Sequence, residues 1–130
     1  MLRGTMFVAA GLLYAGTSHA FEATLETTAE GEVKTRLESA SAILEAAKND
    51  VTTPEEIIAA VQSDYRALIG ALYREGYYGP SISIRVDGRE GADMSLISLP
   101  STINTVVINV TPGPRFRFGS ATVAPLAPDT

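Results

Sequence analysis

Cysteine and tryptophan are absent from the sequence, and the only histidine is His19. Without cysteine, the chain forms no disulfide and has no thiol nucleophile. His19 lies in a segment that we expect to be removed, so the remaining chain has no imidazole for Ser-His catalysis or for a histidine-based zinc site. We therefore expect no enzyme activity, no catalytic residue, no bound metal and no cofactor.

The first 20 residues have the pattern of a secretory signal peptide. Arg3 gives a positive start, residues 6–15 form an apolar run, and the small residues Ser18 and Ala20 precede a cleavage position. The run is too short to span a bilayer, which needs about 20 apolar residues. A buried helix is the alternative, but Gly16 to Ser18 break the segment before any amphipathic pattern begins. We expect cleavage after Ala20 and export.

Basic residues are also scarce. Removal of residues 1–20 leaves about 110 residues, one domain, with nine basic residues against fifteen acidic ones. Nucleic-acid binding depends on neutralisation of phosphates by Lys and Arg. The acidic balance therefore predicts that nucleic acid is not a partner.

Carboxylates are the only remaining candidates for catalysis or metal binding. Glu55 and Glu56 are adjacent at a helix start, where negative charge stabilises the helix dipole. Asp87, Glu90 and Asp93 share one loop, but they lack the dense Asp, Asn and Gly spacing of a calcium loop. We interpret the first pair as capping residues and the second group as a solvated loop.

Hydrophobic periodicity predicts a strand followed by two helices. Residues 21–27 alternate apolar and polar, which is typical of a strand with one buried face. Residues 32–48 repeat apolar positions every three or four residues, which predicts one helix. The second helix begins at Thr53-Pro54-Glu55-Glu56, where proline stands at the first helical position and Thr53 and Glu56 form a capping box. Gly76 is the expected stop.

Two strands are expected after the helices, and the start of a third follows them. Residues 81–87 alternate cleanly, which predicts a strand with one solvated face. Residues 89–102 form an unusually long loop that packs some apolar side chains on the domain. Residues 103–110 are rich in β-branched residues and predict a central strand, and residues 116–123 predict one more strand, bent at Gly119. The order strand, helix, helix, strand, strand predicts an α+β domain.

Two stretches resemble the POTRA domains of outer-membrane barrel assembly proteins. They are residues 71–88 (ALYREGYYGPSISIRVDG) and residues 107–123 (VINVTPGPRFRFGSATV). The positions that match the family pattern are Gly76, Tyr78, Gly113, Pro114, Phe116 and Gly119. The chain is most similar to the first POTRA domain of the TamA-like outer-membrane subunit of the translocation and assembly module.

The resemblance implies a fold and a longer protein. The fold is β-α-α-β-β over residues 21–113, a three-stranded mixed sheet covered on one face by two antiparallel helices. Residues 114–130 would then be a link and the first strand of a following domain. The link residues are Gly113, Pro114, Arg115, Phe116, Arg117, Phe118 and Gly119.

The resemblance also implies a location and partners. The domain would lie on the periplasmic side of the outer membrane, in a chain that continues through further POTRA domains into a membrane barrel. Its partners would be those domains and that barrel, an inner-membrane or periplasmic assembly partner, and nascent outer-membrane proteins.

Partner recruitment in such a domain would use strand addition, in which an extended peptide pairs with an open sheet edge. We expect this edge to be Ser81, Ile82, Ser83, Ile84, Arg85 and Val86. The alternative is a standalone periplasmic module for a ligand or a cell-wall component, which needs a pocket with converging polar groups.

Two further groups have a structural and a functional interpretation. Tyr73, Tyr77 and Tyr78 are either packing residues or interface anchors. Arg115 and Arg117 are either solvated or paired with an adjoining domain.

Overall fold

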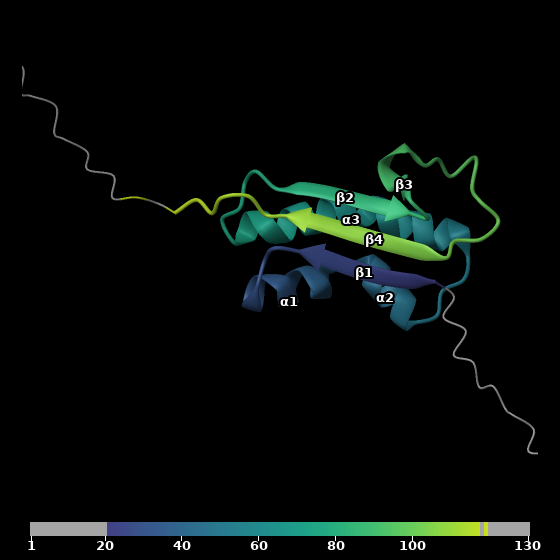
Figure 1. Cartoon of the computed structure of the whole chain (residues 1–130), viewed down its shortest axis with the longest axis horizontal. Helices are drawn as coiled ribbons and strands as arrows, with labels where there is room; N and C mark the ends of the chain where they lie inside the picture. Colours follow the sequence, from purple (N-terminus) through teal and green to yellow (C-terminus); the bar gives the residue numbers. More distant parts are fainter. Residues whose placement is uncertain (1–20, 118, 120–130) are drawn as a thin grey trace, which may run out of the picture.

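A computed structural model describes residues 21–117 and 119, and it shows a sheet with helices packed on one face (Figure 1). The elements in chain order are β1 (Glu22–Thr27), α1 (Gly31–Ala40), α2 (Ala42–Lys48), α3 (Pro54–Arg74), β2 (Ser81–Val86), β3 (Arg89–Glu90), the 3-10 helix η1 (Gly91–Asp93) and β4 (Thr105–Thr111). The predicted α+β class is confirmed, and the order is broadly consistent with a β-α-α-β-β arrangement.

The sheet is mixed and has the strand order β1-β4-β2-β3. β1 runs parallel to β4, whereas β2 is antiparallel to both β4 and β3. β4 is central, as its β-branched residues predicted, and it buries Val106, Ile108 and Val110 against the helices.

Within residues 21–117 and 119, the sheet has four strands rather than the three implied by the resemblance. Arg89 and Glu90 belong to the segment interpreted as a loop, but they pair with Val86 and Arg85 of β2. The reversal is made by Asp87 and Gly88, whose φ angles are 49° and 83°. Asp-Gly favours positive φ at both positions, which is what a tight hairpin turn requires.

The single helix predicted over residues 32–48 is wrong, because the structure divides it into α1 and α2 at Ser41. Ser41 has an extended backbone, with φ −81° and ψ 115°, and its hydroxyl accepts a hydrogen bond from the amide of Leu44. Asp64, on α3, accepts hydrogen bonds from the amides of Ala42 and Ile43. These acceptors satisfy amides at the start of α2, so the chain can interrupt the helix there.

α3 begins at Pro54 and ends before Gly76, as predicted. At its start, Thr53 is the capping residue, but its side chain makes no capping hydrogen bond, so the predicted reciprocal capping box does not form. At its end, Gly76 has a φ of 91°, and the amide of Tyr77 donates to the carbonyl of Leu72 at 2.9 Å. A glycine with positive φ at this position lets the following amides donate hydrogen bonds to carbonyl groups of the last helical turn, which would otherwise be unpaired.

The core lies between the helical layer and the inner face of the sheet. It includes Leu37 of α1, Ile43 of α2, Ile58 and Leu68 of α3, and Ile84 of β2, all fully buried. The long segment after β3 contributes in part: Met94 is buried, whereas Leu96 and Ile97 are exposed. Within residues 21–117 and 119, no helix is both long and apolar enough to cross a bilayer.

Candidate functional site

The sheet has two edges at which another polypeptide could pair. The edge expected from the sequence, β2, is not free along its whole length, because Arg85 and Val86 pair with β3. Among the described residues, Ser81 to Ile84 have no strand partner on that side.

Side chains cover part of the β2 edge. The carboxylate of Glu90 accepts hydrogen bonds from the hydroxyls of Ser83, at 2.8 Å, and Tyr65. The Tyr65 hydroxyl also lies 3.4 Å from the carbonyl oxygen of Ile84. Burial, together with the hydrogen bond to Glu90, raises the pKa of Tyr65 to about 12, and the same hydrogen bond lowers the pKa of Glu90. Coverage of this kind is one way in which proteins limit pairing at an edge.

Asp87 and Glu90, the acidic residues of the β2–β3 region, form hydrogen bonds with different partners. Asp87 accepts hydrogen bonds from the amides of Asn104, at 3.1 Å, and Thr105, at 2.8 Å, whereas Glu90 contacts Tyr65 and Ser83. In the part of the chain that the structure describes, no group of three acidic side chains is close enough to hold a metal ion. Asp87 instead fixes the start of β4 beside β2.

β1 forms the other edge of the sheet, and it is open along its length within the described residues. Its first residue, Glu22, donates its amide to the carbonyl of Asn104 at 2.8 Å. Successive residues of a strand alternate in direction, so Glu22, Thr24 and Glu26 direct their backbone groups toward β4. The backbone groups of Ala23 and Leu25 therefore point away from the sheet.

A groove of about 750 Å³ follows this open edge. We call it the β1 groove; its lining consists of residues 21–25 together with Thr35, Glu38 and Ser39 of α1 and Leu44, Ala47 and Lys48 of α2. In Figure 1, α1 and α2 lie below β1 and extend past its outer edge. The helical layer is thus wider than the sheet on this side, which leaves a surface on which one more strand could rest.

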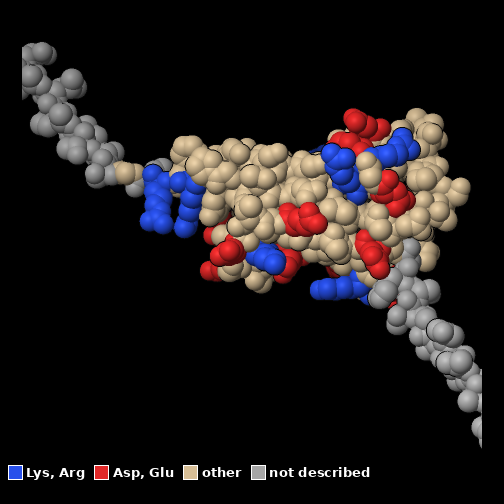
Figure 2. Space-filling view, viewed as in Figure 1, with Lys and Arg blue, Asp and Glu red and all other residues tan. Residues whose placement is uncertain are grey.

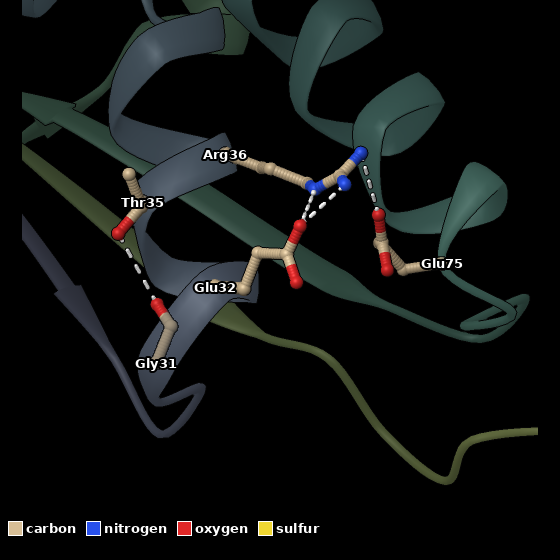
Figure 3. Close-up of polar contacts among 5 residues, drawn as sticks. All are labelled: Gly31, Glu32, Thr35, Arg36 and Glu75. Carbon is tan, nitrogen blue, oxygen red and sulfur yellow. Dashed lines mark hydrogen bonds and ion pairs between the residues drawn. The ribbon is translucent and has the colours of Figure 1, made fainter.

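An arginine on α1 links this helix to the end of α3. Arg36 contacts Glu32 one turn earlier, at 2.5 Å, and Glu75 at the end of α3, at 3.0 Å (Figure 3). The hydrogen bond from Arg36 lowers the pKa of Glu32. On the same helix, Thr35 donates its hydroxyl to the carbonyl of Gly31 and also lines the groove.

Charge is distributed unevenly over the sheet face. Figure 2 shows acidic side chains along β1. The surface over β4 and β2 carries few charged side chains, and more appear near β3. Glu22 and Glu26 both lie exposed on the face of β1 that the helices leave uncovered. The uncovered face of β1 is therefore acidic.

The predicted link follows β4 and is held against the end of α3. The amide of Phe116 donates to the carbonyl of Gly76 at 2.8 Å, and Nε of Arg115 donates to the carbonyl of Glu75 at 3.0 Å. Arg115 also forms an isolated antiparallel bridge with Tyr77. Phe118 and most of the strand predicted over residues 116–123 lie outside the described residues.

Aromatic side chains gather beside this link. Tyr78 contacts Tyr73 and Phe116, with ring centroids 5.4 Å and 5.9 Å apart. Their exposed fractions are 47% for Tyr73, 52% for Tyr78 and 59% for Phe116, so this is a surface cluster rather than core packing. Tyr77 is half-buried and packs against the core.

Sequence reasoning missed the β1 groove. The alternation of residues 21–27 predicted the strand and its buried face, but the open edge was expected on residues 81–86 and not on β1. The available signal was the spacing of Glu22, Thr24 and Glu26, which alternate with apolar residues. Comparisons with protein-family models, with curated proteins and with solved structures gave no match to this chain.

Proposed function

We propose that this chain is a periplasmic recruitment module of an outer-membrane protein assembly or translocation factor. It binds extended segments of partners, or of nascent outer-membrane proteins, by strand addition to its sheet. The POTRA resemblance suggests the location and the class of partner.

One observation carries the proposal. β1 is a six-residue strand at an open edge, and a groove formed with α1 and α2 lies directly beside it. Strand addition requires unpaired backbone groups in a row and room for alternate side chains of the incoming peptide. The β1 edge supplies both. The Ser81 to Ile84 edge of β2 is the second place for such pairing, although Glu90 and Tyr65 cover part of it.

The size of the groove also favours a second candidate function, a standalone module for a small ligand. Ligand pockets usually combine an apolar lining with a few converging polar groups. Here Thr35, Glu38, Ser39 and Lys48 are the polar side chains that the two helices contribute. A small ligand would occupy the groove without using the backbone of β1.

Site-specific photo-crosslinking in cells that export the protein tests the main proposal. A photoreactive residue is placed at Glu26 on β1, at Ser81 on β2, and at Glu55 on α3 as the exposed control. We expect crosslinks from Glu26 or Ser81 to polypeptides that mass spectrometry identifies as outer-membrane proteins or assembly factors, and none from Glu55. If neither edge gives such crosslinks while the protein remains folded, recruitment by strand addition is wrong.

A further inference from the structure

We infer that the β1 groove binds an extended peptide in which apolar residues alternate with polar ones and two basic residues stand four positions apart. The inference rests on the proposed function, strand addition, and names the edge and the chemistry of the segment it accepts. It follows from three features of β1: its backbone, its apolar face and its charges.

The backbone of β1 offers more open pairing positions than that of β2. Ala23 and Leu25 direct their amide and carbonyl groups away from β4, toward the groove. On β2, the outward groups of Val86 pair with β3, and the outward carbonyl of Ile84 lies beside the Tyr65 hydroxyl. A new strand therefore finds two consecutive outward-facing positions on β1 without displacing any side chain that the structure describes there.

The side chains of the incoming strand are constrained by the same alternation. Residues directly opposite Ala23 and Leu25 point to the same side as those residues, which is the side of the helices. There they meet the lining of the β1 groove, in which Leu44 and Ala47 of α2 are the apolar side chains that the helices contribute. Apolar residues are expected at these two positions of the peptide because they remove this surface from water.

The remaining positions of the peptide face the uncovered side of the sheet. They lie opposite Glu22, Thr24 and Glu26, and the two carboxylates are exposed. Opposite charges directly across two strands stabilise pairing, whereas like charges oppose it. Basic residues are therefore expected opposite both glutamates, with a polar residue between them.

A second copy of this chain fits the edge less well. Antiparallel pairing of two β1 strands about Thr24 would place Glu22 of each copy opposite Glu26 of the other. Both cross-strand pairs would then be repulsive. The charge pattern favours a basic heterologous segment over self-association.

Peptide binding tests the inference directly. The probe is a fluorescent, blocked peptide with the central pattern Lys-Val-Thr-Val-Lys, which reads the same in either strand direction, and the full chain is titrated by anisotropy. The controls are Glu-Val-Thr-Val-Glu and the composition-matched Val-Lys-Thr-Lys-Val, in which the basic residues are two positions apart. We expect the first peptide to bind most tightly and its advantage to shrink with added salt.

Variants locate the binding on β1. Ala23→Pro removes an outward amide but none of the hydrogen bonds to β4, and we expect about a tenfold loss of affinity with unchanged circular dichroism. The double variant Glu22→Gln/Glu26→Gln should weaken the Lys peptide by roughly 2- to 30-fold. Glu45→Gln, an exposed change on α2 outside the groove lining, is the matched control and should bind as the unchanged protein does. Should Ala23→Pro fail to fold, Glu22→Lys/Glu26→Lys provides the decisive test, because it should reverse the preference toward the Glu peptide.

The outcomes separate this inference from the function on which it rests. Equal binding of the Lys and Glu peptides, or no binding of any peptide, overturns the inference. Self-association in analytical ultracentrifugation that Ala23→Pro abolishes also overturns it, because the occupant would then be a second copy. In each of these cases, crosslinks from either sheet edge in the exporting cells would leave recruitment by strand addition standing. If neither edge gives crosslinks in those cells, recruitment by strand addition is wrong, regardless of which peptides bind in solution.

Discussion

The buried carboxylate of Asp64 should be essential for the helical layer beneath the β1 groove. Asp64 is fully buried on α3, and it accepts hydrogen bonds from the Ser41 hydroxyl, at 2.5 Å, and from the amides of Ala42, at 2.7 Å, and Ile43, at 3.3 Å. Asp64→Ala removes the acceptor for all three donors. α2 would lose these hydrogen bonds to α3, and the part of the groove formed by α2 would loosen.

The magnitude follows from which donors stay buried. The hydrogen bonds from Ser41 and Ile43 are buried. The amide of Ala42 is only partly buried, so a water molecule can replace the lost carboxylate as its acceptor. A buried donor left without a partner costs about 1–3 kcal/mol, so Asp64→Ala should lower the free energy of unfolding by about 2–6 kcal/mol. Small domains have total stabilities of about 5–15 kcal/mol, so this is a large fraction of the whole.

Urea unfolding followed by far-UV circular dichroism measures this loss. Asp93→Ala, an exposed change at the end of η1, is the control and should alter the stability by less than about 0.5 kcal/mol. A loss below about 1 kcal/mol for Asp64→Ala would contradict the reasoning, because the donors would then have found other partners.

The pH dependence of the same site gives a second test. Burial raises the pKa of the Asp64 carboxyl above the ordinary 3.8, and the hydrogen bonds from Ser41, Ala42 and Ile43 oppose this effect. Because the folded-state pKa is raised, the folded protein favours the protonated carboxyl. The stabilisation that this gives against unfolding is complete below pH 3.8 and is lost as the pH rises through the folded-state pKa. The stability advantage of the unchanged protein over Asp64→Asn should therefore fall with rising pH. An advantage that grows with pH would show that the hydrogen bonds outweigh burial.

Three further predictions concern the core, the helix end and the β2 edge. Ile58→Ala, at a fully buried position, should cost about 2–5 kcal/mol in urea unfolding, and a cost below about 1 kcal/mol would contradict the packing described. Gly76→Ala forces an L side chain into a φ of 91° and places its Cβ 2.9 Å from the carbonyl oxygen of Phe116, so we expect a loss of about 1–3 kcal/mol in the same assay; an unchanged midpoint would mean that the link does not lie against this glycine. The pKa of Glu90 is lowered chiefly by the Tyr65 hydroxyl, so its contribution to stability is present above pH 4.5 and is lost as the pH falls. The difference between the unchanged protein and Glu90→Gln should therefore vanish in urea unfolding at low pH, and a difference that persists there would refute the assignment.

The sequence by itself determined the class of fold and most of the element boundaries. Proline at position 54 and glycine at position 76 act locally, through a fixed φ and through tolerance of positive φ, so both ends of α3 were predictable. The β-branched run of β4 identified the central strand because such residues favour the strand conformation and pack against neighbouring strands on both sides. The alternation in β1 and β2 showed which of their residues face the core.

Tertiary structure decided the features that depend on a partner distant in the sequence. Ser41 interrupts a helical pattern that is otherwise continuous, and the acceptor that makes the break favourable, Asp64, lies 23 positions away. The coverage of β2 by Glu90 and Tyr65 likewise joins residues 25 positions apart. The open edge belongs to β1 because β4, the last strand that the structure describes, inserts between β1 and β2. Local periodicity specifies which face of a strand is buried, but strand order is set by how the whole chain packs, and only that order reveals the β1 groove.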